Sequence, residues 1–103
     1  MEEQKRQKSL GYKVREKVTP PPNYNVVIHN DDYTTMDFVV LLLETVFRKS
    51  KSEALALMLK VHHEGKGIAG TYSYDIAQTK AQQGINLARN SGFPLELTVE
   101  PEE

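Results

Sequence analysis

The chain contains no cysteine and no long apolar segment. Without cysteine it has no disulfide, no thiol nucleophile and no thiolate ligand for a metal, which is typical of proteins from a reducing compartment. Its longest apolar run, 38–43, is far shorter than the roughly 18 residues that a membrane-spanning helix needs. The first residues lead into no apolar segment, so we expect no signal peptide and a cytoplasmic protein.

Motifs of catalysis and metal binding are also missing. The sequence has no Gly-x-Ser-x-Gly turn for a nucleophilic serine, and no glycine-rich loop that opens a helix and holds phosphate. His62 and His63 are adjacent, so on a helix they point about 100° apart and cannot easily share a metal ion. We therefore expect no enzymatic activity, no cofactor and no metal. A metal site that combines His29, Asp31 and Asp32 with the histidine pair is the alternative.

Charge is distributed unevenly along the chain. The total is −1 over 103 residues, but 1–22 hold six basic and three acidic side chains, which gives this segment +3 and leaves −4 for the rest. An acidic body argues against nucleic acid as the main partner, because phosphate binding needs a basic face. The segment 1–22 has few large apolar groups and ends in three prolines, which cannot continue a helix. We expect a disordered extension over 1–22, either inert or ordering on a partner, and a folded domain over 23–103.

Local patterns predict three strands and three helices. Short β-branched or alternating segments predict strands at 24–28, 68–72 and 95–100. Helical spacing of apolar residues predicts helices at 36–48, 53–63 and 74–90, with capping signals at Thr34, Ser50 and Ser73. The order strand-helix-helix-strand-helix-strand is typical of a small α+β domain. We expect a three-stranded antiparallel sheet with all three helices packed on one side.

The same spacing predicts which helix faces are buried. In the first helix Leu41 falls off the apolar face and should be partly exposed. The third helix has an inner face of small residues suited to close packing on a sheet, and Gly84 at its centre costs about 1 kcal/mol in a helix. Its members are Ile76, Ala77, Lys80, Ala81, Gly84, Ile85 and Ala88.

Three polar side chains, Asn30, Asp31 and Asp32, follow the first strand. A turn needs only one such residue, so three in a row also gather oxygen acceptors that suit a small cation with several N–H donors. A free amino terminus and a metal ion are such cations. The alternative is a plain turn followed by a helix cap.

A second cluster lies on the second helix, where Met58, Val61 and His62 share a patch at i, i+3 and i+4. His62 is either a ligand-binding side chain or a charged imidazole favoured by the helix dipole. Spacing alone favours ordinary core positions for Met36 and Met58.

Two motifs carry a resemblance to a known family. The first runs Asn30-Asp31-Asp32-Tyr33-Thr34, Met36, Phe38-Val39, and the second Leu57-Met58-Leu59, Val61-His62, Gly65-Lys66, Ile68, Gly70. Together with Pro21-Pro22, Tyr24, Val26, Thr79-Lys80 and Pro94-Leu95, they resemble the ClpS family over about residues 20–100. These bacterial adaptors deliver N-end rule substrates to an AAA+ unfoldase and its ClpP-type protease. Thr35 stands where the family commonly has proline, which should relax the helix cap only slightly. His63 stands where the family often has an aromatic residue.

The resemblance implies a substrate-binding site without catalysis. The family binds the first residue of a protein when it is Leu, Phe, Tyr or Trp. The implied residues for the α-amino group are Asn30, Asp31, Asp32 and His62, and which of the two acids bonds directly stays open. The implied hydrophobic pocket consists of Ile28, Thr34, Met36, Val39, Met58, Val61 and Leu95, with Met36 crowding β-branched first residues.

The resemblance also implies partners. The extension 1–22 would engage a ClpA- or ClpC-type unfoldase, and Asp75 and Lys80 would dock on the N-terminal domain of that unfoldase. Asp75 replaces a longer acid of the family. We expect a monomer whose partners are this unfoldase and N-degron peptides, with no nucleic acid and no membrane. The alternative is a docking scaffold without N-terminus recognition, since fold alone does not fix function.

Overall fold

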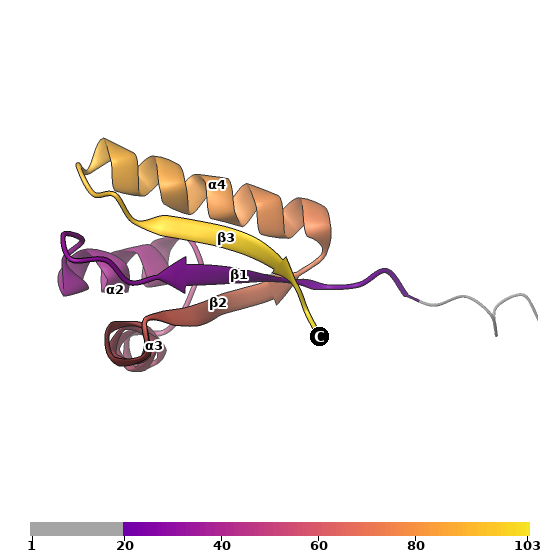
Figure 1. Ribbon diagram of the computed structural model, residues 1–103, viewed down its shortest axis with the longest axis horizontal. Helices are drawn as coiled ribbons and strands as arrows, with labels where there is room; N and C mark the ends of the chain where they lie inside the picture. Colours follow the sequence, from indigo (N-terminus) through magenta and orange to yellow (C-terminus); the bar gives the residue numbers. More distant parts are fainter. Residues whose placement is uncertain (1–19) are drawn as a thin grey trace, which may run out of the picture.

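The elements follow one another in the order β1, α2, α3, β2, α4, β3 (Figure 1). The computed structural model describes residues 20–103. Its strands are β1 (Tyr24–His29), β2 (Lys66–Tyr72) and β3 (Glu96–Pro101), and its helices are α2 (Met36–Thr45), α3 (Lys51–Glu64) and α4 (Tyr74–Asn90). The predicted α+β class and element order are confirmed. The disordered extension predicted for 1–22 falls, except for its last three residues, outside the described part of the chain.

The strands form one antiparallel sheet in the order β2-β1-β3. The central strand is β1, which pairs with β2 from Tyr24↔Tyr72 to His29↔Lys66. The register shifts after Val26, where β2 contains one extra residue, so β2 carries a bulge.

Within residues 20–103, no helix combines the length and apolar character that crossing a membrane requires.

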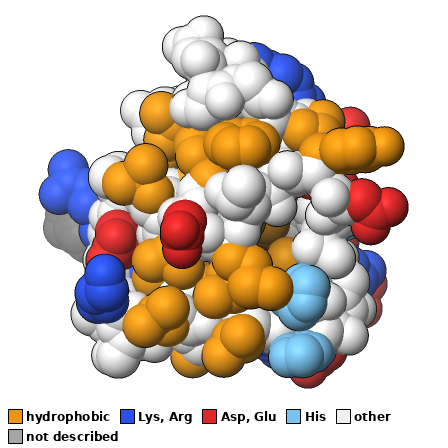
Figure 2. All heavy atoms as spheres, turned by 90° about the vertical axis from the view of Figure 1, so that its left-hand side faces the viewer, with side chains coloured by type: hydrophobic (Ala, Val, Ile, Leu, Met, Phe, Trp, Pro, Cys, Tyr) orange, Lys and Arg blue, Asp and Glu red, His pale blue; other side chains and the backbone are white. Residues whose placement is uncertain are grey.

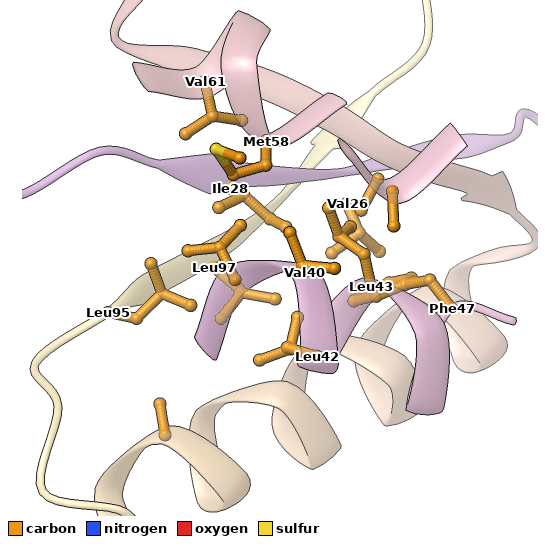
Figure 3. Packing of buried hydrophobic residues seen from close by; sticks show 14 of the residues in the cluster. Val26, Ile28, Val40, Leu42, Leu43, Phe47, Met58, Val61, Leu95 and Leu97 are labelled. Atoms are coloured by element: carbon orange, nitrogen blue, oxygen red, sulfur yellow. The ribbon is translucent and has the colours of Figure 1, made fainter. Parts of the chain in front are cut away.

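One face of the sheet carries the core (Figure 3). Val26 and Ile28 of β1 are fully buried there, because alternate residues of a strand point to the same face. All three helices contribute to this core, which agrees with the prediction that they pack on one side. The next residue, His29, lies on the other face, where its Nε2 is 2.8 Å from the hydroxyl of Thr98 on β3.

Helix α2 begins at Met36 as predicted, but its cap residue and its C-terminal end differ from the prediction. The N-cap is Thr35, whose hydroxyl accepts a hydrogen bond from the backbone N–H of Phe38 at 3.1 Å, so the prediction of Thr34 as the cap is wrong. The helix ends at Thr45 instead of residue 48. Lys80 of α4 donates from Nζ to the carbonyl of Val46 at 2.8 Å, which satisfies a free carbonyl of the helix end. Arg48 then adopts a left-handed backbone with φ 58°.

The other helices follow their signals more closely. Ser50 and Glu53 form the predicted capping box at the start of α3, with both reciprocal hydrogen bonds present. One prediction for α2 itself is also confirmed, because Leu41 is 47% exposed. On α4 the close approach at Gly84 is confirmed, because a Cβ there would lie 2.8 Å from Cδ2 of Leu97. Ile76 is 51% exposed, so its placement on the inner face of α4 is wrong.

Ser73 stands at the N-cap of α4, as predicted. Its hydroxyl accepts no hydrogen bond from the backbone of this helix, which the structure describes throughout. Asp75 supplies a negative charge in the first turn, where the helix dipole favours one. The start of α4 therefore depends on charge and packing instead of a side-chain cap.

Candidate functional site

The loop between β1 and α2 is folded around the carboxylate of Asp31. Its Oδ1 accepts hydrogen bonds from the backbone N–H groups of Tyr33, at 2.8 Å, and Thr34, at 2.7 Å. Its Oδ2 accepts a third hydrogen bond from the hydroxyl of Thr34, also at 2.7 Å. Thr34 is therefore used inside the loop, which explains why the neighbouring Thr35 caps the helix.

The environment of Asp31 favours its ionised form. Partial burial alone would raise the pKa of this carboxyl, but the three hydrogen bonds from Thr34 and Tyr33 and the positive charge of Arg89 outweigh it. The net effect holds the pKa of Asp31 below its ordinary value. The carboxylate that organises the loop is therefore charged at neutral pH.

A backbone hydrogen bond joins this loop to the end of α3. The N–H of Asn30 donates to the carbonyl of Gly65 at 2.8 Å. Gly65 is the C-cap of α3, with φ 93°, a left-handed conformation that glycine adopts without steric cost. Its own N–H donates to the carbonyl of Val61 at 2.9 Å. The end of β1 and the last turn of α3 are thus held side by side.

A hollow of about 220 Å³ lies where these elements meet. One part of its lining is polar and consists of hydrogen-bond acceptors, and the other part is apolar. It is lined by Asn30, Asp31, Asp32, Thr34, Met36, Val39, Met58, Val61 and His62. Figure 2 views the end of the molecule at which β1 leaves the sheet, and histidine side chains lie there beside a gathering of hydrophobic side chains. The hollow offers acceptors and an apolar wall to the same ligand.

The lining brings together all four side chains that the sequence predicts for an amino group. It also brings together Thr34, Met36, Val39, Met58 and Val61 from the predicted hydrophobic pocket. The remaining two, Ile28 and Leu95, are 0% and 1% exposed and lie among the buried side chains of the core (Figure 3). Met36 is 43% exposed, so it stands at the mouth, whereas Met58 and Val61 are buried.

The other predicted residues lie elsewhere. Asp75 is exposed in the first turn of α4, and Lys80 is half-buried with its Nζ on the carbonyl of Val46. Five residues apart, their side chains point about 140° apart around the helix. The ring of His63 lies 5.3 Å from that of His62, centroid to centroid, in an edge-on arrangement.

Across residues 20–103 no three His, Cys, Asp or Glu side chains are grouped to hold a metal ion.

The sequence gives no prediction for Arg89, which the structure places next to the loop. Its Nη1 donates to the carbonyl of Phe93 at 3.0 Å and to that of Leu95 at 2.8 Å. Its charge also acts on Asp31. The available sequence signal is a basic residue in the last turn of a helix, which is common and has its own explanation in the helix dipole.

This fold and this hollow define a small α+β binding domain that presents hydrogen-bond acceptors and an apolar wall to one ligand. Comparison with known proteins makes the assignment specific. The family model of the ATP-dependent Clp protease adaptor protein ClpS matches residues 19–98. The chain belongs to the ClpS family, as the two sequence motifs indicate, and the family is one of adaptors of the Clp protease.

Similar proteins span nearly the whole chain. The ClpS adapter protein of Desulforapulum autotrophicum is 53% identical over 90 residues, which covers 87% of this chain and 86% of that protein. That of Treponema denticola is 48% identical over 98 residues, covering 95% and 97%. Among solved structures, Agrobacterium tumefaciens ClpS2 bound to L-phenylalaninamide superposes with a TM-score of 0.78 at 40% identity, covering 81% of this chain and all (100%) of that one.

Proposed function

We propose that the hollow binds the free amino terminus of proteins that begin with Leu, Phe, Tyr or Trp. The protein then delivers them to a ClpA- or ClpC-type AAA+ unfoldase for degradation by ClpP. The observation that carries this proposal is the lining of one hollow of about 220 Å³ by hydrogen-bond acceptors and by an apolar wall. The ligand of the Agrobacterium ClpS2, L-phenylalaninamide, has one part for each of these: an amino group for the acceptors and an aromatic side chain for the apolar wall.

The amino group is held by the polar part of the lining. An α-ammonium has three N–H donors, and the amide oxygen of Asn30, the carboxylate of Asp32 and a ring nitrogen of His62 are three acceptors. Asp32 is exposed and has no hydrogen-bond partner among residues 20–103, whereas the oxygens of Asp31 already accept three hydrogen bonds. We therefore assign the direct bond to Asp32, and assign Asp31 to shaping the loop. Charge-assisted hydrogen bonds of this kind are roughly twice as strong as neutral ones.

The first side chain of the substrate lies against the apolar wall. Val39, Met58 and Val61 form its fixed part, because all three are buried. Met36 stands at the mouth and closes over the side chain, since a thioether is flexible and packs well on aromatic rings. A volume of about 220 Å³ is below the range of about 300–1,000 Å³ found for drug-sized ligands, so it suits a single residue.

Titration with short fluorescent peptides that differ only at the first residue tests this function. We expect binding for Phe, Leu, Tyr and Trp, and none for Ser or Glu. The matched control is the Phe peptide with an acetylated amino terminus. Acetylation removes the charge and leaves the acceptors unpaired, so affinity should fall by about 10⁴-fold. Equal binding of the free and acetylated peptides would refute recognition of the amino terminus.

Delivery needs a second surface, which we place at the start of α4. Asp75 is exposed there between two exposed apolar side chains, Tyr74 and Ile76, and such a combination suits a protein interface. Lys80 uses one of its three N–H donors on Val46, so two remain for a partner. In this proposal the extension 1–22 engages the unfoldase while α4 docks on its N-terminal domain.

A further inference from the structure

Arg89 connects three parts of the structure around the candidate site. It lies in the last turn of α4, and its Nη1 donates to two carbonyls, those of Phe93 and Leu95. The residue between them, Pro94, has no N–H, and the N–H of Phe93 donates to the carbonyl of Ala88 at 2.9 Å. The two bonds from Arg89 add to this one in fixing the path by which the chain reaches β3.

The same guanidinium is close to the loop of the site. Arg89 and the exposed Tyr33 line a second hollow of about 610 Å³, while Asp31 and Thr34 line the first, so the loop separates the two. The positive charge of Arg89 is the smallest of the influences that lower the pKa of Asp31, after the hydrogen bonds from Thr34 and Tyr33. That carboxylate holds the backbone of Tyr33 and Thr34, which sets the direction of the side chains in the loop.

We propose that Arg89 is a positioning residue for the amine-binding loop. It clamps the Phe93–Leu95 segment, whose Phe93 and Pro94 line the second hollow together with Tyr33 of the loop, so that the loop presents Asn30 and Asp32 to the first hollow. This inference rests on the proposed function and deepens it, because it assigns a role in substrate binding to a side chain that the ligand does not touch.

The charged and titratable groups around Asp31 give this role a pH signature. Asp32 and His62 line the first hollow, and Arg89, Tyr33 and Glu96 line the second. Since the pKa of Asp31 is lowered in the folded protein, its bonds are complete above the ordinary pKa of an aspartate. They are lost as the pH falls through the lowered value. Removal of the guanidinium charge raises the pKa of Asp31, so the loop should open at a higher pH.

The test compares Arg89→Gln, Arg89→Lys and the control Lys60→Gln, which removes one positive charge from an exposed position of α3 outside both hollows. Affinity for a Phe-initiated fluorescent peptide is measured at pH 7. We expect Arg89→Gln to bind about fivefold more weakly, because the loop is held less well although the ligand itself loses no hydrogen bond. Arg89→Lys should regain part of that affinity, and Lys60→Gln should stay within about twofold.

A ligand-free measurement separates this inference from the proposed function. Amide hydrogen exchange at Tyr33 and Thr34 and the carboxyl titration of Asp31 are followed by NMR in the folded variants. Faster exchange and a raised Asp31 pKa in Arg89→Gln support the positioning role, even if the wild type binds no peptide. Unchanged exchange and titration in both Arg89 variants would overturn it, even if the wild type binds. Circular dichroism identifies a variant that fails to fold, and Arg89→Lys then carries the test.

Discussion

At the scale of single residues, the mouth and the depth of the hollow have different properties. Met36 is exposed at the mouth, whereas Met58 is buried on α3. An exposed, flexible side chain can restrict which ligands enter without supporting the fold. Substrate selectivity should therefore respond to changes at Met36, while changes at Met58 should affect stability as well.

Met36→Ala should widen acceptance to peptides that begin with Ile or Val, because truncation removes the group that crowds a branched Cβ. Affinity for Phe peptides should fall modestly, because the thioether contact with the ring is lost while the wall formed by Val39 and Val61 is intact. A peptide titration over first residues measures this, with Leu41→Ala as a control at an exposed position of the same helix outside the hollow. Selectivity identical to the wild type would contradict a gatekeeper role.

His62→Ala should weaken binding of a Phe peptide by about 1–3 kcal/mol, the cost of one lost hydrogen bond to a charged group. The adjacent His63 provides a matched control, because it lies on the same helix end outside the lining of the hollow. His63→Ala should leave peptide affinity unchanged. If both variants keep full affinity and both lower the stability of the fold, His62 stabilises the C-terminal end of α3 and does not bind the ligand.

Part of the site could be predicted at this scale, and part could not. Asn30 and His62 are recognisable from their motifs, and the hollow brings them together. The sequence does not indicate that Asp31, and not Asp32, accepts the loop hydrogen bonds, because either carboxylate could do so. Arg89 escaped prediction because its partners are backbone carbonyls, whose positions depend on the fold.

At the scale of elements, α2 and α4 begin where predicted and α3 begins two residues before the predicted 53, whereas α2 ends three residues before the predicted 48. Ser50 and Glu53 specify the start of α3 through contacts within four residues. The end of α2 depends on Lys80, which is 34 positions away from Val46 in the sequence. Such an end has no local signature, so the spacing of apolar residues predicts a helix that is three residues too long. Ile76 shows the same limitation, since spacing alone does not reveal how far an apolar face reaches.

Gly84→Ala should lower the free energy of unfolding by about 0–2 kcal/mol. Alanine gains about 1 kcal/mol in helix propensity, but its Cβ would lie 2.8 Å from Cδ2 of the buried Leu97, and overpacking typically costs about 1–3 kcal/mol. Denaturant unfolding measures the change. In a Leu97→Val background the clash is relieved, so Gly84→Ala should be neutral or stabilising there, which a double-mutant cycle detects. Equal effects in both backgrounds would contradict a steric cause.

At the scale of the whole molecule, the proposal assigns peptide binding and delivery to separate parts of the chain. The hollow is built entirely from residues 30–62. Deletion of residues 1–17 should therefore leave peptide affinity unchanged and stop the degradation of a Phe-initiated protein by the unfoldase and ClpP. A control variant with the sequence of 1–17 scrambled separates the effect of length and composition from that of sequence. Undiminished degradation by the truncated protein would show that the extension plays no part in delivery.

The hydrogen bond between Asn30 and Gly65 involves only main-chain atoms. Substitution of a wall side chain leaves this main-chain link in place, so in the proposed function the binding of the amino terminus and the choice of side chain can evolve separately. Variants of Met36, Val39 or Val61 could acquire new preferences while keeping the requirement for an unblocked first residue. A series of variants with substituted wall residues could thus serve as reagents that sort proteins by their N-terminal residue.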